Sequence, residues 1–316
     1  MEIKKTALLT GGAGFIGSNL ANRLIEDKWK VCIVDNLSTG YIHNIPKQAE
    51  FLELDVTNPT FIDSLSDYNY DVVFHLAAQS SGEVSFDDPL YDLKTNCAST
   101  VMLLDYCLKK GIKRFIYTSS MSIYGEQKEL PVSEDSKAKP LSFYGVGKLA
   151  SESYMDVYNN MGINTTALRL FNVYGPGQNL TNLKQGMVSI YMAYLLKGQE
   201  IIVKGSLERF RDFIYIDDIV QAIMECISNN QTYGKKYNIG TGYKTTVADL
   251  IDAEIVSFGY KPDEYPVVVQ EGTPGDQFGI IADNRQFYND VGWYPKVSLK
   301  DGLFKMVSWA KGQINR

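Results

Sequence analysis

The sequence predicts an α/β fold built on a doubly wound parallel sheet, because strand-like and helix-like segments alternate over its first 180 residues. The predicted strands are rich in β-branched or aromatic residues and span 6–10, 29–35, 49–55, 70–77, 113–119 and 163–170. Helix-length segments lie between them, at 15–27, 91–110 and 145–161. Near-continuously apolar strands separated by helices indicate a parallel sheet that is covered on both faces. Ligands of such sheets bind beyond the carboxyl ends of the strands.

The alternation stops near residue 175. The residues YGPGQ (174–178) predict a turn, and a helix near 185–197 and short strands near 201–203 and 211–215 follow it. We therefore predict a main domain over residues 1–175 and a smaller lobe over residues 176–316. The lobe is expected to be interleaved with the main domain, with the chain crossing between the two.

Composition argues against several classes of partner. The 316 residues include 31 Lys and Arg and 37 Asp and Glu, so the formal net charge is −6, and the basic residues are scattered. Binding to a phosphate backbone needs a basic face, so we expect no nucleic-acid partner. No apolar stretch approaches the ~20 residues that span a bilayer, and the N-terminal apolar segment is too short for a signal peptide. We therefore expect a cytoplasmic protein without a membrane partner.

Cysteine and histidine are too few and too dispersed for a metal site. Cys32, Cys97, Cys107 and Cys226 lie far apart, no CxxC pair occurs, and the chain has only two histidines. Buried free thiols are therefore expected, and neither zinc nor a disulfide framework. His75 ends a buried predicted strand, and we interpret it as structural.

A glycine-rich turn follows the first predicted strand. In TGGAGFIGS (10–18), Gly12, Gly14 and Gly17 fit GxGxxG, and Gly11, Gly14 and Gly17 fit the looser GxxGxxG. A tight turn, a backbone close to a pyrophosphate and close helix–strand packing each require a residue without a Cβ. The motif lies between a predicted strand and a predicted helix, which is typical of a Rossmann dinucleotide-binding domain.

Asp35 indicates which dinucleotide binds. It ends the second predicted strand, 18 residues after Gly17, where a carboxylate can accept hydrogen bonds from ribose hydroxyls and would repel a 2′-phosphate. No Arg follows it directly. The predicted cofactor is therefore NAD rather than NADP.

A candidate catalytic set is found by its position in the fold. The pattern YxxxK occurs as Tyr106/Lys110, Tyr124/Lys128 and Tyr144/Lys148. Only Tyr144 and Lys148 open a predicted helix, where a four-residue spacing puts both side chains on one face. This helix also follows the fifth predicted strand, which ends in Ser119 and Ser120 beside the expected cofactor.

The chemistry explains why these residue types occur together. A Tyr phenol has an ordinary pKa near ~10, so a base working at neutral pH needs a pKa lowered by roughly three units, or about 4 kcal/mol. The Lys148 ammonium and the nicotinamide cation would supply that field. The Ser120 hydroxyl can then bridge Tyr144 and a substrate hydroxyl. We therefore expect a lowered pKa at Tyr144.

These motifs identify a resemblance along most of the chain. The blocks are TGGAGFIGS (10–18), DNLSTG (35–40), HLAAQ (75–79), TSSMSIYG (118–125), YGVGK (144–148), LRLFNVYGPG (168–177), RDFIYIDD (211–218), YNIGTG (237–242) and GWYPKVSL (292–299). In this pattern the chain resembles extended short-chain dehydrogenases. It is closest to UDP-glucose 4-epimerases and relatives that act on UDP-N-acetyl sugars or UDP-uronic acids.

The resemblance implies roles for individual residues. The implied pyrophosphate contacts are Gly11, Gly14, Phe15, Ile16 and Gly17. The implied adenosine contacts are Asp35, Asn36 and Ser38 at the ribose and Asp55 and Val56 at the adenine. The other implied cofactor residues are Leu76, Ala77, Ala78, Asn96, Tyr144, Lys148 and Phe171. The implied substrate residues are Ser120, Ser122 and Tyr144 at the sugar and Asn172 and Arg211 at the diphosphate.

Three positions bear on the reaction and the substrate. Related dehydratases and decarboxylases usually have a Glu at the position of Ser122, and hexose 4,6-dehydratases an Asp at that of Met121. Without either carboxylate the chain resembles epimerases, in which only a hydride and one proton move. The RxGD block of epimerases reads TPGD, with Thr273 in place of Arg. A position that sets pocket size in relatives corresponds to Ile280.

We therefore predict an NAD-dependent 4-epimerase of a UDP-sugar (UDP-Glc, UDP-GlcNAc or UDP-GlcA type) that oxidises C4 transiently. Polysaccharide assembly is the expected setting. The resemblance also implies a homodimer that pairs through segments 91–110 and 145–161. The alternatives are an epimerase, 4-dehydrogenase or dehydratase of a GDP-, CDP- or dTDP-sugar, and a non-catalytic NAD-sensing protein.

Overall fold

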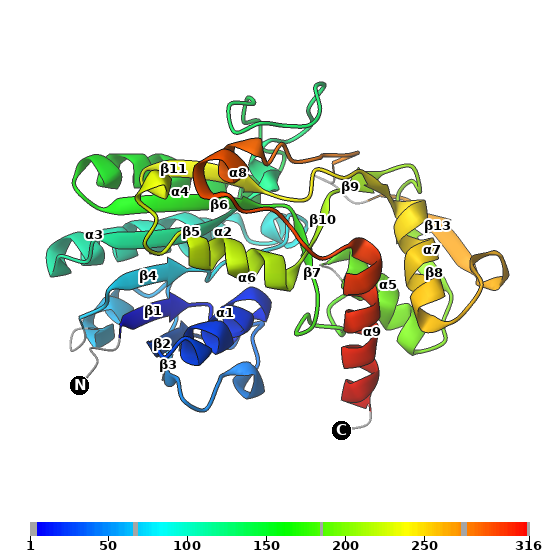
Figure 1. Ribbon diagram of the computed structural model, residues 1–316, viewed down its shortest axis with the longest axis horizontal. Coiled ribbons are helices and arrows are strands. Elements are labelled where there is room, and N and C mark those ends of the chain that lie inside the picture. Colours follow the sequence, from blue (N-terminus) through cyan, green and yellow to red (C-terminus); the bar gives the residue numbers. More distant parts are fainter. Residues whose placement is uncertain (1–4, 66–68, 184–185, 273–276, 315–316) are drawn as a thin grey trace.

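The computed structural model describes residues 5–65, 69–183, 186–272 and 277–314. Its centre is a sheet of seven strands, all parallel, in the order β11-β6-β5-β4-β1-β2-β3 (Figure 1). These strands are β1 (Thr6–Thr10), β2 (Lys30–Asp35), β3 (Glu50–Glu53), β4 (Val72–His75), β5 (Arg114–Ser120), β6 (Asn164–Leu170) and β11 (Lys235–Ile239). The predicted doubly wound α/β fold is confirmed.

Helices cover both faces of this sheet. One face carries α1 (Phe15–Glu26) and α6 (Ile216–Glu225), and the other carries α3 (Ser99–Lys110) and α4 (Phe143–Asn160), while α8 (Arg285–Val291) lies against β11. Successive residues of β1 show the division, because Ala7 and Leu9 belong to the core under α1 and Leu8 to the core under α3. A strand buried on both faces has to be apolar at every position, which explains the continuous apolar segments in the sequence.

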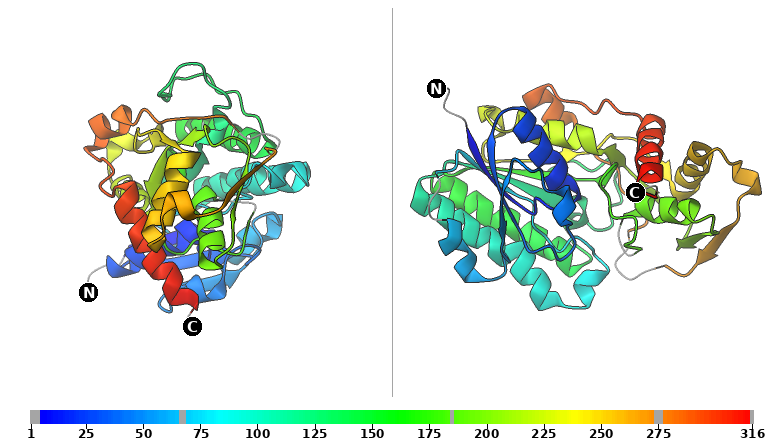
Figure 2. Two further views of the ribbon diagram at one scale, coloured as in Figure 1. Left: turned by 90° about the vertical axis from the view of Figure 1, so that its right-hand side faces the viewer. Right: turned by 90° about the horizontal axis from the view of Figure 1, so that it is seen from below.

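A second group of elements forms a lobe beyond the carboxyl ends of the strands (Figures 1 and 2). Its helices are α5 (Met187–Leu196), α7 (Val247–Phe258) and α9 (Leu299–Ile314), which pack on one another. Its strands pair as β7 (Asn172–Tyr174) with β10 (Phe213–Tyr215), β8 (Ile201–Lys204) with β13 (Val267–Gln270), and β9 (Phe210–Arg211) with β12 (Thr245–Thr246).

The chain crosses between the sheet and the lobe several times. After β8, β9 and β10 it returns to the sheet in α6 and β11, and it enters the lobe again in β12 and α7. The domain limits of 1–175 and 176–316 stay a prediction, but this path shows why a single cut cannot separate all of the sheet from all of the lobe. Among the described residues, no helix is long and apolar enough to cross a membrane.

Segment 91–110, expected to be one helix, is divided. It consists of α2 (Pro89–Leu93), a π-helical turn (Lys94–Ala98) and α3. The wider turn directs Asn96 toward α4, where Gly147 permits a close approach because a Cβ there would lie 3.0 Å from the Asn96 Cβ. Such π-turns are often found at functional sites.

Candidate active site

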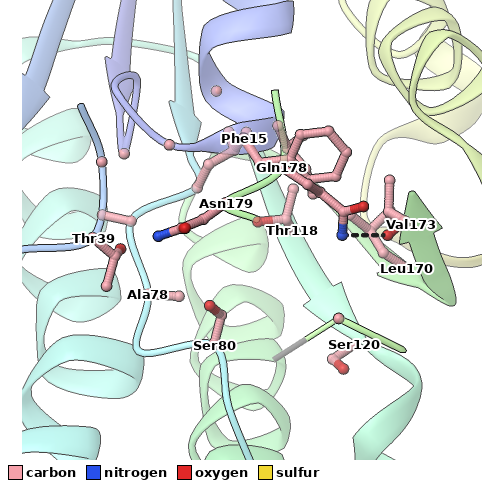
Figure 3. A pocket seen from close by; sticks show the side chains of 18 of the residues that line it. Phe15, Thr39, Ala78, Ser80, Thr118, Ser120, Leu170, Val173, Gln178 and Asn179 are labelled. Atoms are coloured by element: carbon pink, nitrogen blue, oxygen red, sulfur yellow. Dashed lines mark hydrogen bonds between the residues drawn. The ribbon is translucent and has the colours of Figure 1, made fainter. Parts of the chain in front are cut away.

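A cleft of about 410 Å³ lies at the carboxyl ends of the parallel strands, facing the lobe. It brings together nearly all of the predicted site residues, of which Figure 3 labels Phe15, Ala78 and Ser120. Those in its wall are Gly11, Gly14, Phe15, Ile16, Gly17, Asp35, Asn36, Ser38, Asp55, Val56, Leu76, Ala77, Ala78, Ser120, Ser122, Tyr144, Lys148, Phe171 and Asn172. Asn96 and Arg211 are not among them.

The glycine turn fits a pyrophosphate for steric reasons. Gly11 has a φ of +74°, which favours glycine, and a Cβ at Gly17 would overlap the carbonyl oxygen of Gly11. Helix α1 therefore begins directly against the end of β1. Its N-cap is Gly14, which has no side chain to cap the first turn. The first residues of α1 line the cleft, and the free N–H groups of a helix N-terminus suit a phosphate.

Carboxylates and an amide lie beside the glycine turn, at one end of the cleft. Asp35 accepts hydrogen bonds from the backbone N–H groups of Ala13 (3.0 Å) and Leu37 (2.8 Å), and burial raises its pKa. Asn36 donates to Asp55 over 3.1 Å. Burial acts to raise the pKa of Asp55, but hydrogen bonds from Thr57 and Asn36 hold it below its usual value. Fixed acceptors at this end suit the ribose hydroxyls of NAD.

Two segments that sequence reasoning did not assign also line the cleft. Residues 39–41 and Asn44 cover one side, and Asn44 donates to the Ala13 carbonyl over 3.0 Å. On the other side, residues 177–179 reach in from the lobe, and Figure 3 shows Asn179 and Gln178 among the lining side chains. Asn19 on α1 holds this loop by donating to the carbonyl of Pro176 over 3.3 Å. The Gly and Pro residues after β7 predicted only a turn there.

Ser120, Tyr144 and Lys148 meet at one point of the cleft. Ser120 is the last residue of β5, and Tyr144 and Lys148 lie one turn apart at the start of α4. Ser142 caps that helix through a 3.2 Å hydrogen bond from the N–H of Gly145. The Lys148 ammonium donates to the Thr118 carbonyl over 2.8 Å. The cap and this bond fix α4 so that both side chains face the end of β5.

The protein's own groups raise the pKa of Tyr144, whereas the sequence analysis expected Lys148 and a nicotinamide cation together to lower it. Burial raises the pKa of Tyr144 to about 12, although hydrogen bonding with Ser120 acts in the opposite direction. Burial also lowers the pKa of Lys148 to about 7, against the attraction of Asp92 and Glu152. Desolvation penalises the charged form of both groups, which spacing alone does not show. The lowering by Lys148 and the nicotinamide ring together stays a prediction.

Asn96 and His75 lie beneath the cleft. Asn96 donates to the Gln79 carbonyl (2.9 Å) and to Asp92 (3.0 Å), so it contributes to the site's support rather than to its wall. His75 is fully buried, and its two ring nitrogens lie 2.7 Å from the Thr10 hydroxyl and 3.0 Å from the Ser99 hydroxyl. Burial and nearby Lys148 lower the pKa of His75 to about 3. A neutral histidine with both nitrogens bonded has the structural role that the sequence indicated.

A second pocket of about 290 Å³ adjoins the cleft and is rich in basic side chains. Lys204, Arg209 and Arg211 line it, and Met121, Ser122 and Asn172 are shared with the cleft. The Arg211 guanidinium donates to the Gln277 carbonyl over 2.7 Å and to the Phe210 carbonyl over 2.8 Å. Burial and the neighbouring Arg209 lower the pKa of Arg211 to about 10, which leaves it charged at neutral pH.

Ile280 and Thr273 are the two positions at which the sequence suggested an effect on substrate binding. Ile280 lines neither pocket, because it is fully buried in a small cluster with Ile123, Tyr124 and Phe171. Its expected direct effect on pocket size is therefore wrong, although Phe171 above it does line the cleft. Thr273 lies outside the described residues. All four cysteines are buried free thiols.

A buried ion pair lies directly behind the catalytic residues. Glu152, one turn after Lys148 on α4, accepts from Arg169 Nη2 over 2.8 Å and from the Ser119 hydroxyl over 2.5 Å. Arg169 in turn donates to the Tyr124 hydroxyl over 2.7 Å. The pair thus joins α4 to the ends of β5 and β6 and to the turn that carries Ser122.

Residues 7–240 match the NAD-dependent epimerase/dehydratase family. The chain belongs to this family. Its cofactor, NAD, agrees with the sequence prediction and with the fit of the glycine turn and Asp35. A curated relative, the UDP-glucose 4-epimerase of Mycolicibacterium smegmatis, is 33% identical over 97% of this chain and 98% of its own.

Two solved structures show how closely the fold agrees with family members. The UDP-glucose 4-epimerase of Thermotoga maritima has a TM-score of 0.93 at 35% identity and covers 98% of this chain and 99% of its own. The UDP-N-acetylglucosamine 4-epimerase of Methanobrevibacter ruminantium has a TM-score of 0.91 at 28% identity, with the same coverage of 98% and 99%. The alignments span the sheet and the lobe together.

Glu152→Gln should reduce the free energy of unfolding by about 3–5 kcal/mol, because it leaves the buried Arg169 charge without its carboxylate. Urea unfolding of the two proteins measures the difference. Asp156→Asn is the matched control, since it neutralises a carboxylate on the same helix whose partner, Lys236, is near the surface. The control should change stability by less than about 1 kcal/mol. An equally small effect at Glu152 would show that the buried pair does not hold α4 in place.

Proposed function

We propose that this chain is an NAD-dependent 4-epimerase of a UDP-sugar. The observation that carries the proposal is the position of Ser120, Tyr144 and Lys148 where the dinucleotide cleft meets the basic pocket. A substrate with its diphosphate in the basic pocket would present its sugar to Tyr144. Among the described residues shared by the cleft and the basic pocket, none is a carboxylate, and Met121 and Ser122 stand where loss of water would require such an acid–base group.

In the proposed reaction, NAD held at the glycine turn and Asp35 would supply a reversible hydride acceptor for C4 of the sugar. Tyr144 removes the proton of the C4 hydroxyl, and Ser120 bridges the two oxygens by hydrogen bonding. The product of this step is a 4-keto sugar, which turns in the pocket before reduction. Tyr144 then gives the proton back to the C4 oxygen. No cofactor is consumed, because the two halves of the reaction cancel.

The basic pocket supports a diphosphate-linked substrate. Lys204, Arg209 and Arg211 bring three positive charges to its wall and Glu83 brings one negative charge. A guanidinium fork suits the paired oxygens of a diphosphate. Asn172 stands between this pocket and the cleft. Uridine is proposed as the base because relatives over the whole chain are named for UDP-sugars.

We also propose that the protein is a homodimer. Exposed apolar side chains follow one face of α4, opposite to its buried residues, and continue onto α2. They are Phe143, Val146, Tyr154, Val157, Leu90 and Leu93. The ring of Phe143 also lies 5.4 Å from that of Phe86, an exposed residue of the turn before α2. A continuous apolar face of this kind is typical of an interface.

We also propose that the protein is cytoplasmic. Its four buried free thiols support this location, because thiols stay reduced in the cytosol.

Purified protein without added cofactor should convert at least one UDP-sugar into its C4 epimer. Proton NMR of UDP-GlcNAc, UDP-Glc and UDP-GlcA would show a new anomeric signal. Accumulation of NADH would instead indicate a net dehydrogenase, and a loss of water by mass spectrometry would indicate a dehydratase. Conversion of only GDP-, CDP- or dTDP-sugars would contradict the proposed base. Inactivity on all of them with NAD still bound would favour an NAD-sensing role.

Tyr144→Phe should lower turnover at least about 100-fold, because the phenol is the only proposed proton carrier. NAD should remain bound, since the ring itself is kept. Turnover from the NMR assay and the absorbance of released NAD measure the two effects. Tyr154→Phe, which alters an exposed tyrosine on the same helix, should leave turnover unchanged. Near-normal turnover in Tyr144→Phe would remove Tyr144 from the mechanism.

Light scattering after size-exclusion chromatography should give twice the mass of one chain at micromolar concentration. Val157→Glu should shift the protein toward the monomer, because a charge in the apolar face opposes its burial. Tyr288→Glu introduces the same side chain at an exposed site on α8 and should remain dimeric. A monomeric wild-type protein would refute the proposed dimer.

A further inference from the structure

Asp92 is a buried carboxylate beside the catalytic lysine that the reaction described above does not use. It lies on α2 and is 1% exposed. Its Oδ2 accepts hydrogen bonds from the side-chain amides of Gln79 and Asn96, each over 3.0 Å. Its Oδ1 is buried and has no hydrogen-bond donor among the described residues. Hydrogen bonding within the protein therefore accounts for only one of the two carboxylate oxygens.

The position of Asp92 is set by its packing against the catalytic helix. A Cβ at Gly147 would lie 3.4 Å from Asp92 Oδ1. Gly147 directly precedes Lys148 and lies three residues after Tyr144, so the oxygen without a donor faces the turn of α4 that carries both. The missing side chain at position 147 is what permits this approach.

A buried charge is costly unless another charge compensates it. Among the described residues Asp92 makes no ion pair within 4.0 Å, and its two hydrogen-bond donors are neutral amides. The nearby buried cation is Lys148, which is 2% exposed and interacts electrostatically with Asp92. Each of these two charges therefore reduces the other's cost of burial.

The other groups around Lys148 cannot fill this role equally well. Glu152 attracts Lys148 too, but Arg169 already binds its carboxylate through two nitrogens. His75, from β4, is neutral near neutral pH because its pKa is lowered to about 3. Tyr117, from β5, presents its ring 4.5 Å from the Lys148 ammonium, and the Tyr144 ring lies at 5.8 Å. Asp92 is thus the carboxylate beside Lys148 that no guanidinium neutralises.

We propose that Asp92 is a positioning residue of the catalytic site: its buried carboxylate is the counter-charge that keeps Lys148 an ammonium beside Tyr144. The proposal rests on the proposed function, because it assigns Asp92 a part in activating the same tyrosine. Asp92 touches neither substrate nor cofactor in this role. It acts through Lys148, and Gln79 and Asn96 hold it in place by bonding to its other oxygen.

The charge of Asp92 has a definite effect on the pH dependence of the reaction. A nearby negative charge raises the pKa of a cation and of a phenol alike. Asp92 acts in this direction on both Lys148 and Tyr144. Removing the charge should therefore let Lys148 lose its proton at lower pH, and a neutral Lys148 no longer stabilises the Tyr144 phenolate. The alkaline limb of the pH–rate profile should move toward acid, whereas loss of a purely structural residue would reduce the rate without moving it.

The decisive variant is Asp92→Asn, which keeps the size of the side chain and removes its charge. The pH profile of epimerisation should shift to lower pH by about one unit. Asp92→Ser is a second neutral variant, in case the first does not fold, and should shift the profile in the same direction. Asp92→Glu retains the charge and should keep the wild-type profile even where its rate is lower. Thermal unfolding and NAD content confirm that each variant is folded and loaded.

Asp156→Asn is the matched control, because it removes an equal charge from the exposed side of α4 and should not move the profile. A profile of Asp92→Asn or Asp92→Ser that superimposes on the wild-type profile would overturn the proposal, since Asp92 would then be protonated and silent. The pH dependence of NADH affinity, followed by fluorescence, gives a second readout through Lys148. If the wild type epimerises no sugar nucleotide, the proposed function fails. A shift of that affinity in Asp92→Asn would still support the assignment of Asp92.

Discussion

The placement of the candidate catalytic residues depends on the buried ion pair between Glu152 and Arg169, which fixes α4 to the ends of β5 and β6. Glu152 also binds the Ser119 hydroxyl, next to Ser120, and Lys148 binds the Thr118 carbonyl on the same strand. Because each contact is made at the carboxyl end of a parallel strand, a shift of α4 along its axis would break all of them together. The tyrosine and lysine are therefore placed by the sheet, although both belong to a helix.

The cleft and the basic pocket each offer groups that suit an anion, by two different means. At one end, the first turn of α1 offers backbone N–H groups, with Gly11 and Gly17 allowing a close approach. At the other, the lobe supplies the guanidinium groups of Arg209 and Arg211. Since the chain as a whole has a net charge of −6, neither end relies on long-range attraction. A short-range solution of this kind binds a compact anion and does not favour a polyanion.

Sequence alone predicted those parts of the site that depend on local spacing. The glycine turn, Asp35 and the pair Tyr144 and Lys148 each follow from a strand end or a helix turn, and all of them line the cleft. Properties that depend on tertiary packing were not predictable. The π-helical turn, the burial of Ile280 and the raised pKa of Tyr144 arise from contacts between segments far apart in the chain. Sequence spacing predicts the position of a residue within a strand or helix. Its burial, and with it its charge state and its neighbours, depends on the tertiary fold.

A reaction that returns its hydride puts an unusual demand on the fold, because the cofactor has to stay while the substrate turns. The cleft shows contacts suited to retention on both of its sides. Asn44 is tied to the Ala13 carbonyl, and Asn19 is tied to the loop after β7 through Pro176. The basic pocket, by contrast, is formed mainly by the lobe. Rigid support on the dinucleotide side, with separate support for the diphosphate, would leave the sugar as the part that is free to rotate beside Tyr144.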